Sequence, residues 1–136
     1  MSPELQLVSS VICDDVLLNA ANRLSLYAVF RDLWADGFPA RVVRLHVVTT
    51  WYNGDDVPGE LIERVTIATP DGETLVGESV TTVSVDAEAY HTQVSRFRDL
   101  TFPHPGAYRV QVQAGPRRRV DLPLVVVGPD PEEVER

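Results

Sequence analysis

The sequence predicts an all-β fold, an antiparallel two-sheet β-sandwich of about eight strands with immunoglobulin-like architecture. Three observations support this prediction. Apolar residues recur at every second position rather than at a helical period, turn residues separate the apolar runs at sandwich-like intervals, and valine is over-used. Strict alternation indicates strands with one buried and one solvated face.

Eight runs carry the alternation. Their expected inward positions are, in chain order, Leu5, Leu7, Ser9 and Val11; Leu24, Leu26, Ala28 and Phe30; Val43, Leu45, Val47, Thr49 and Trp51; Val65 and Ile67; Val76, Val80 and Val83; Val94, Leu100 and Phe102; Tyr108, Val110 and Val112; and Val120, Leu122, Leu124 and Val126. The third run is the longest, and the fifth alternates least cleanly. Residues 86–90 are long enough for one helical turn at most.

Turn residues bound these runs. Asn19–Asn22 closes the first connection, Asn53–Asp56 follows the third run, and Gly115-Pro116 opens the last connection. Pro70–Glu73 is the clearest hairpin turn, because Asp and Gly tolerate the backbone angles that tight turns require. Pro123 lies inside the last run and cannot donate a ladder hydrogen bond, so we expect that strand to lie at a sheet edge or to carry a bulge.

The chain length of 136 residues is that of one domain. We expect a single sandwich over residues 1–128 and a disordered acidic tail over residues 129–136. Such a domain buries enough surface to need no disulfide or metal. Residues 32–39 are expected to form a loop that contains aromatic side chains.

Charge and targeting features limit the function classes. The net charge is −8, and all 12 basic residues are arginine. This balance argues against binding to nucleic acid or to anionic membranes. A basic leader and a long apolar run are both missing from the sequence, so we expect a cytoplasmic protein. The single cysteine, Cys13, is expected to be a small buried side chain.

Motifs for catalysis and cofactor binding do not emerge from the sequence. There is no Gly-x-Ser-x-Gly elbow and no glycine-rich phosphate loop, and His46, His91 and His104 lack the spacing of zinc ligands. Asp14 and Asp15 are most simply turn-capping residues; a metal site there would need acids from other loops. The sequence therefore predicts no enzyme activity, no cofactor and no metal.

Two segments carry a family resemblance. The first is Ile12–Val16, which contains Cys-Asp-Asp, followed shortly by Arg23–Phe30. The second is Phe102–Val110, which contains Pro-Gly-x-Tyr. Together they resemble a family of small uncharacterised bacterial proteins, a domain of unknown function, which implies no activity. The second element is also similar to the penultimate strand of immunoglobulin-like sandwiches, and this likeness implies that Tyr108 forms a tyrosine corner.

Seven residues are candidates for a binding surface: Trp34, Phe38, Trp51, Tyr52, Arg117, Arg118 and Arg119. The aromatic residues could anchor a partner or could cover one end of the sandwich. The arginines could form a solubilising turn or a patch for an anion or acidic partner, to which Arg96, Arg98 and Arg109 could add.

The function that the sequence favours is non-catalytic binding to another protein or to a second copy of the chain. One alternative is a module for a small ligand, namely a carbohydrate, an anion or a metal, which would use Trp51, Tyr52 and nearby acids. A less favoured alternative is an enzyme whose site is assembled across loops.

Overall fold

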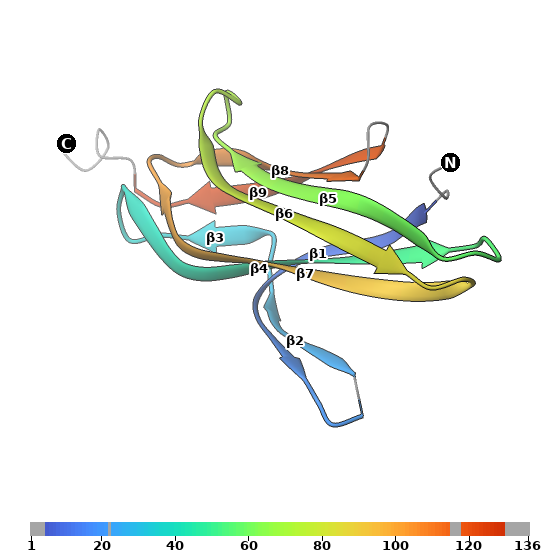
Figure 1. Ribbon diagram of the computed structural model, residues 1–136. Helices are drawn as coiled ribbons and strands as arrows, with labels where there is room; N and C mark the ends of the chain where they lie inside the picture. The colour runs from blue at the N-terminus through green and yellow to red at the C-terminus, as the bar shows by residue number, and fades with distance from the viewer. Residues whose placement is uncertain (1–4, 22, 115–117, 130–136) are drawn as a thin grey trace.

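The computed structural model describes residues 5–21, 23–114 and 118–129, and it confirms the predicted all-β sandwich. Two sheets pack face to face, one with strand order β2-β1-β4-β7 and the other with strand order β3-β9-β8-β5-β6 (Figure 1). The strands are β1 (Leu5–Leu18), β2 (Leu24–Val29), β3 (Asp32–Trp34), β4 (Ala40–Asn53), β5 (Gly59–Ala68), β6 (Leu75–Val85), β7 (Ala89–Phe102), β8 (Gly106–Ala114) and β9 (Arg118–Val127). We refer below to the four-stranded and the five-stranded sheet.

The ninth strand is β3, which lies inside the segment expected to be a loop. Its three residues pair with Val125–Val127 of β9 in parallel, whereas the other strand pairs are antiparallel. A three-residue strand is too short to give an alternating signal, which is why the sequence did not predict it. Phe30 and Arg31 join β3 directly to β2, so one run of chain passes from the edge of one sheet to the edge of the other.

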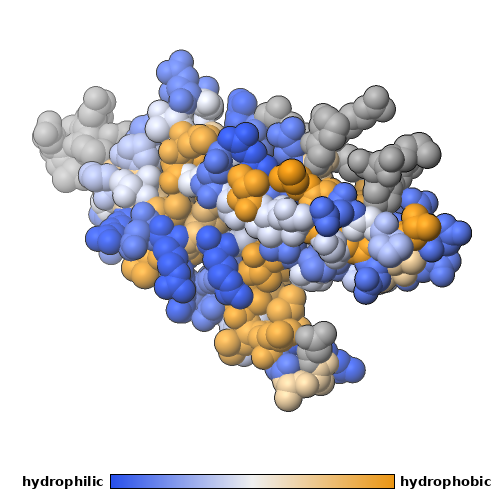
Figure 2. Space-filling model, in the orientation of Figure 1, coloured by the Kyte–Doolittle hydropathy of each residue, from blue (hydrophilic) through white to orange (hydrophobic). Residues whose placement is uncertain are grey.

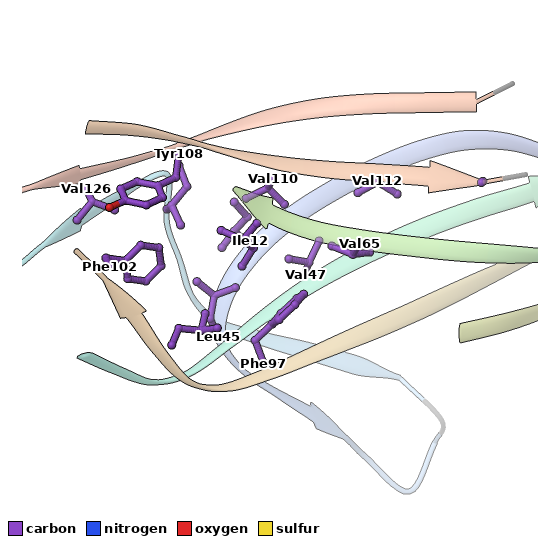
Figure 3. Close-up of a cluster of buried hydrophobic side chains, with 14 of the residues drawn as sticks. Ile12, Leu45, Val47, Val65, Phe97, Phe102, Tyr108, Val110, Val112 and Val126 are labelled. Carbon is purple, nitrogen blue, oxygen red and sulfur yellow. The ribbon is translucent and has the colours of Figure 1, made fainter. Parts of the chain in front are cut away.

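The core lies between the two sheets, where the inward rows of both contribute large side chains (Figure 3). Fully buried members include Leu45, Val47, Val65, Ile67, Phe102, Tyr108, Val110, Leu124 and Val126. These are the inward positions that the alternation predicted for β4, β5, β7, β8 and β9. Burial of these side chains is the main contribution that holds the two sheets together.

Several predicted faces were wrong in part. Leu24 and Ala28 of β2 and Val80 of β6 were expected to face inward and are exposed. The pairing of β1 with β4 shifts register between Leu7 and Ser9, so Leu5, Leu7 and Ile12 face the core rather than Ser9 and Val11. In β4 the core-facing residues are Ala40 and Val42 and then Leu45 onwards, and Val43 is exposed to solvent. A bulge inserts one residue and turns the following side chains to the opposite face, and alternation alone does not locate it.

The tyrosine corner is confirmed. The Tyr108 hydroxyl donates a hydrogen bond of 2.6 Å to the carbonyl oxygen of His104, and it lies 3.3 Å from the His104 amide, which donates to it. The ring meets Phe102 edge to face at 4.9 Å. This arrangement fixes the turn before β8 to the core. The expectation for Pro123 also holds, because β3 pairs only with the last three residues of β9 and leaves the strand at an edge at this position.

Candidate interaction surface

One element projects beyond the sandwich. The last part of β1 and β2 extend the four-stranded sheet beyond β4 as a two-stranded hairpin that projects from the sandwich (Figure 1). Val16, Leu17 and Leu18 pair with Leu26, Ser25 and Leu24 across it. We call Val16–Leu18 together with Leu24–Val29 the apolar hairpin.

Both faces of the apolar hairpin carry apolar side chains. Residues that pair across antiparallel strands share a face, so Val16, Leu18, Leu24 and Leu26 lie on one side and Leu17 and Tyr27 on the other. Five large apolar residues, Leu17, Leu18, Leu24, Tyr27 and Val29, are 37–62% exposed. The space-filling view shows the hairpin as an apolar projection from a largely polar face (Figure 2). Strands with apolar residues on both faces are normally covered on both sides, so this surface is unusually apolar for an isolated domain.

A second, smaller core supports the base of the hairpin. Cys13, Val16 and Val48 are buried there, and Leu26 and Val94 pack against them. Burial raises the pKa of the Cys13 thiol, and the negative charges of Asp14 and Asp15 raise it further. Cys13 is thus an interior packing residue, and the hairpin is attached to the four-stranded sheet by side-chain packing as well as by the chain.

Asp14 and Asp15 both form ion pairs with an arginine of the same chain. The Arg44 guanidinium lies 3.3 Å from a carboxylate oxygen of Asp14 and 3.6 Å from one of Asp15. The Asp14 carbonyl oxygen is also 3.0 Å from the His46 ring. Among the residues that the structure describes, no group of three or more His, Cys, Asp or Glu side chains is arranged to hold a metal ion.

The four aromatic candidates do not form one surface. Trp34 is 81% exposed on β3, and Phe38 packs partly against the main core. Trp51 is only 1% exposed and belongs to the core, so the proposed surface role for Trp51 does not fit the structure. Tyr52 lies on the opposite face of β4 and contacts Tyr90 with ring centroids 4.8 Å apart. Neighbouring residues of a regular strand point to opposite faces, so Trp51 and Tyr52 cannot form one platform.

The arginine candidates are only partly described. Arg117 lies outside the described residues, and for Arg118 and Arg119 the structure gives the backbone pairing with β8. Arg96 and Arg98 alternate with the buried Phe97 on β7, while Arg109 lies on β8 of the other sheet. The additional arginines therefore belong to different sheets and do not extend a single patch. The acidic tail from residue 130 onwards also lies outside the described residues.

Sequence reasoning missed a buried polar cluster around Glu63. Its side chain is 1% exposed, and its carboxyl group accepts a 2.6 Å hydrogen bond from the Trp51 indole nitrogen. The Thr49 hydroxyl lies 3.0 and 2.9 Å from its two oxygens. Burial raises the pKa of Glu63, while the hydrogen bonds from Trp51 and Thr49 and the nearby His91 oppose that rise.

A signal for this cluster was present in the sequence. Leu61, Glu63, Val65 and Ile67 share one parity along β5, so the inward row includes a carboxyl group. A lone charged residue in an apolar row indicates a buried group that needs partners. Because the cluster is closed off between the sheets, it is a structural element of the core rather than a surface site.

The fold and this surface define the class of protein: an all-β sandwich domain with a projecting apolar hairpin. Within the described residues there is no helix with the length and apolar character needed to cross a membrane. The chain belongs to a family of unknown function, DUF6941, whose model matches residues 8–127.

Solved structures share the sandwich fold. A β-glucosidase from Listeria innocua in complex with gluconolactone has 16% sequence identity and a TM-score of 0.56, and the match covers 92% of this chain but 16% of the enzyme. A β-D-glucoside glucohydrolase from Trichoderma reesei gives 12% identity, a TM-score of 0.56, and coverage of 92% and 19%. The chain thus spans less than one fifth of these enzymes, and the likeness concerns the fold alone. No match was found among curated proteins.

Proposed function

We propose that this domain is a non-catalytic protein-binding module and that the apolar hairpin is its docking surface. The observation that carries the proposal is the partial exposure of five large apolar side chains on one projecting hairpin. Contiguous apolar patches of this kind on a folded domain typically mark contact sites for proteins.

The backbone of the hairpin supports the same function. β2 is the outermost strand of the four-stranded sheet and pairs only with β1. Its outer edge can accept a further strand, which would give main-chain hydrogen bonds in addition to apolar contact. The second core packs the base of the hairpin on the four-stranded sheet, which limits the ordering that is required when a partner binds.

The small-ligand alternative loses support from the burial of Trp51. A carbohydrate platform at Trp51 and Tyr52 requires both rings on one accessible face, and the structure places them on opposite faces of β4. Docking through the apolar hairpin does not depend on either residue.

A photo-crosslinking amino acid placed at Leu17 tests the docking surface in cells that express the full chain. The matched control is the same amino acid at Val80 on β6, because Leu17 is 54% and Val80 57% exposed. We expect discrete protein adducts from position 17 that position 80 does not give. The same adduct pattern from both positions, or none from either, would overturn the proposal.

A further inference from the structure

The strand β2 lacks the features that normally protect a sheet edge. Proteins block exposed edges with charged side chains, proline or a covering element. Leu24–Val29 contains no charged residue and no proline, and its residues are exposed apart from Leu26. Ala28, with a φ of 54°, is the one irregular position in the strand, and it lies towards its end. An edge of this composition favours pairing with another strand.

The distribution of charge makes the hairpin the place where a second copy of the chain can approach. The chain carries a net charge of −8, so two copies repel each other over most of their surfaces. Residues 16–30 contain no acidic residue and only one charged residue, Arg23. The hairpin is therefore a place where two acidic copies can approach without bringing carboxylates together.

The available area fits a small dimer. Side chains of this size present roughly 150–200 Å² when fully exposed, so the five half-exposed residues offer about 400–500 Å² on each copy. Pairing through β2 covers only part of this area, because Leu17 and Leu18 lie on β1 and the exposed side chains point to both faces of the hairpin. Two copies would therefore bury less than about 1,000 Å², which is the size of a weak, transient interface. We therefore expect a dimer that dissociates in the micromolar range.

We propose that two copies of this chain pair through β2, antiparallel and across a two-fold axis, so that their four-stranded sheets join into one continuous sheet. A two-fold axis places the same surface of each copy against itself, and the uncharged, apolar composition of β2 makes it complementary to its own mate. This inference rests on the proposed docking function of the apolar hairpin and identifies the partner.

Disulfide trapping tests the geometry. Ser25→Cys, Leu26→Cys and Tyr27→Cys, made singly, cover the middle of β2, where an antiparallel two-fold places the residue on its axis opposite its own symmetry mate. Thr82→Cys on β6, the outer strand of the five-stranded sheet, is the control, and the native Cys13 is buried and should not interfere. We expect rapid covalent dimers from at least one β2 variant and not from Thr82→Cys. Failure of all three β2 variants, or equal trapping at Thr82, would overturn the proposal.

Analytical ultracentrifugation of the full chain measures the affinity. Leu24→Lys and Tyr27→Lys, both on β2, should each raise the dimer dissociation constant at least tenfold, while Val80→Lys should leave it within about twofold of wild type. Higher ionic strength should tighten the dimer, because salt screens the repulsion between the acidic copies. Binding of an oppositely charged partner would weaken under the same conditions.

The two proposals fail in different ways. The chain could remain monomeric up to high micromolar concentration and still give hairpin-specific adducts with another protein in the cell. That result would refute the β2 dimer and support the docking function. Absence of hairpin-specific adducts of any kind would remove both proposals.

Discussion

Replacing Glu63 separates two effects that the buried cluster combines, the cost of a charge in the core and the value of its hydrogen bonds. Glu63→Gln keeps the shape and can still accept from the Trp51 indole while donating to the Thr49 hydroxyl. Glu63→Ala removes the acceptor from both donors. The two variants therefore share the loss of the ionisable group and differ in hydrogen bonding.

The sign of the pH dependence follows from burial. Because burial raises the pKa of Glu63, the folded protein keeps this proton at pH values where the unfolded chain has already released it. The wild-type free energy of unfolding should then fall between the unfolded-chain pKa, about 4.3, and the raised folded pKa, with a slope of up to about 1.4 kcal/mol per pH unit. Glu63→Gln lacks this contribution, so its stability relative to wild type should rise across that window and level off above it.

The alanine variant measures how much the hydrogen bonds to Glu63 contribute to the free energy of unfolding. Loss of the carboxyl leaves the Trp51 indole N–H unpartnered and the Thr49 hydroxyl with only the Gln93 carbonyl oxygen at 3.4 Å. Each buried donor without a partner costs about 1–3 kcal/mol, and the space left by the side chain adds to this. Glu63→Ala should therefore be about 2–5 kcal/mol less stable than Glu63→Gln.

Urea unfolding of the three proteins between about pH 4 and pH 9, followed by tryptophan fluorescence, measures both quantities. A difference between wild type and Glu63→Gln that stays constant over the whole range would refute the reasoning that burial keeps Glu63 protonated. Equal stability of the Gln and Ala variants at every pH would refute the role of the hydrogen bonds.

Three further outcomes are expected. Tyr108→Phe should lower the free energy of unfolding by about 1–2 kcal/mol, since it removes both hydrogen bonds to the His104 backbone; urea unfolding checks this, and an unchanged midpoint would contradict it. The Cys13 thiol should react with a disulfide reagent only as fast as the domain opens, because it is buried and its pKa is raised; fast reaction in native buffer would show an accessible thiol. Gly106→Ala should cost about 2 kcal/mol in thermal or urea unfolding, because φ is 150° there and a Cβ would lie 2.7 Å from Pro70, and a loss below about 0.5 kcal/mol would contradict it.

The alternation in the sequence was sufficient to predict the sandwich because the inward rows are regular over most of their length. From Tyr108 to Val112 in β8 every second residue is buried, and Leu45 to Trp51 in β4 keep the same inward spacing although His46 and Val48 on the other face are also buried. The tyrosine corner could also be predicted, because the Pro-Gly-x-Tyr element resembles the start of the penultimate strand in immunoglobulin-like sandwiches. The register shift between Leu7 and Ser9 could not, because a bulge changes which face is buried without changing composition.

The candidate site was harder to predict than the fold. The candidates for a binding surface were chosen because they are aromatic. This choice selected Trp51, which is a core residue, and passed over the exposed Leu17 and Leu18. The better signal was the absence of charge from Val16 to Leu18 and from Leu24 to Val29, on both sides of a turn. Apolar residues at consecutive positions of a hairpin leave no polar face for water, and this pattern predicts a surface that a partner covers.

The continuous run from β2 to β3 has a mechanical consequence for the domain. Only Phe30 and Arg31 separate the two strands; Phe30 packs on the main core, and the Val125 amide of β9 donates to the Arg31 carbonyl at 3.0 Å. Tension applied to the hairpin therefore reaches the five-stranded sheet through these two residues. There the three parallel residue pairs between β3 and β9 resist it. A partner that pulls on the tip of the hairpin would therefore load both sheets at once through Phe30 and Arg31.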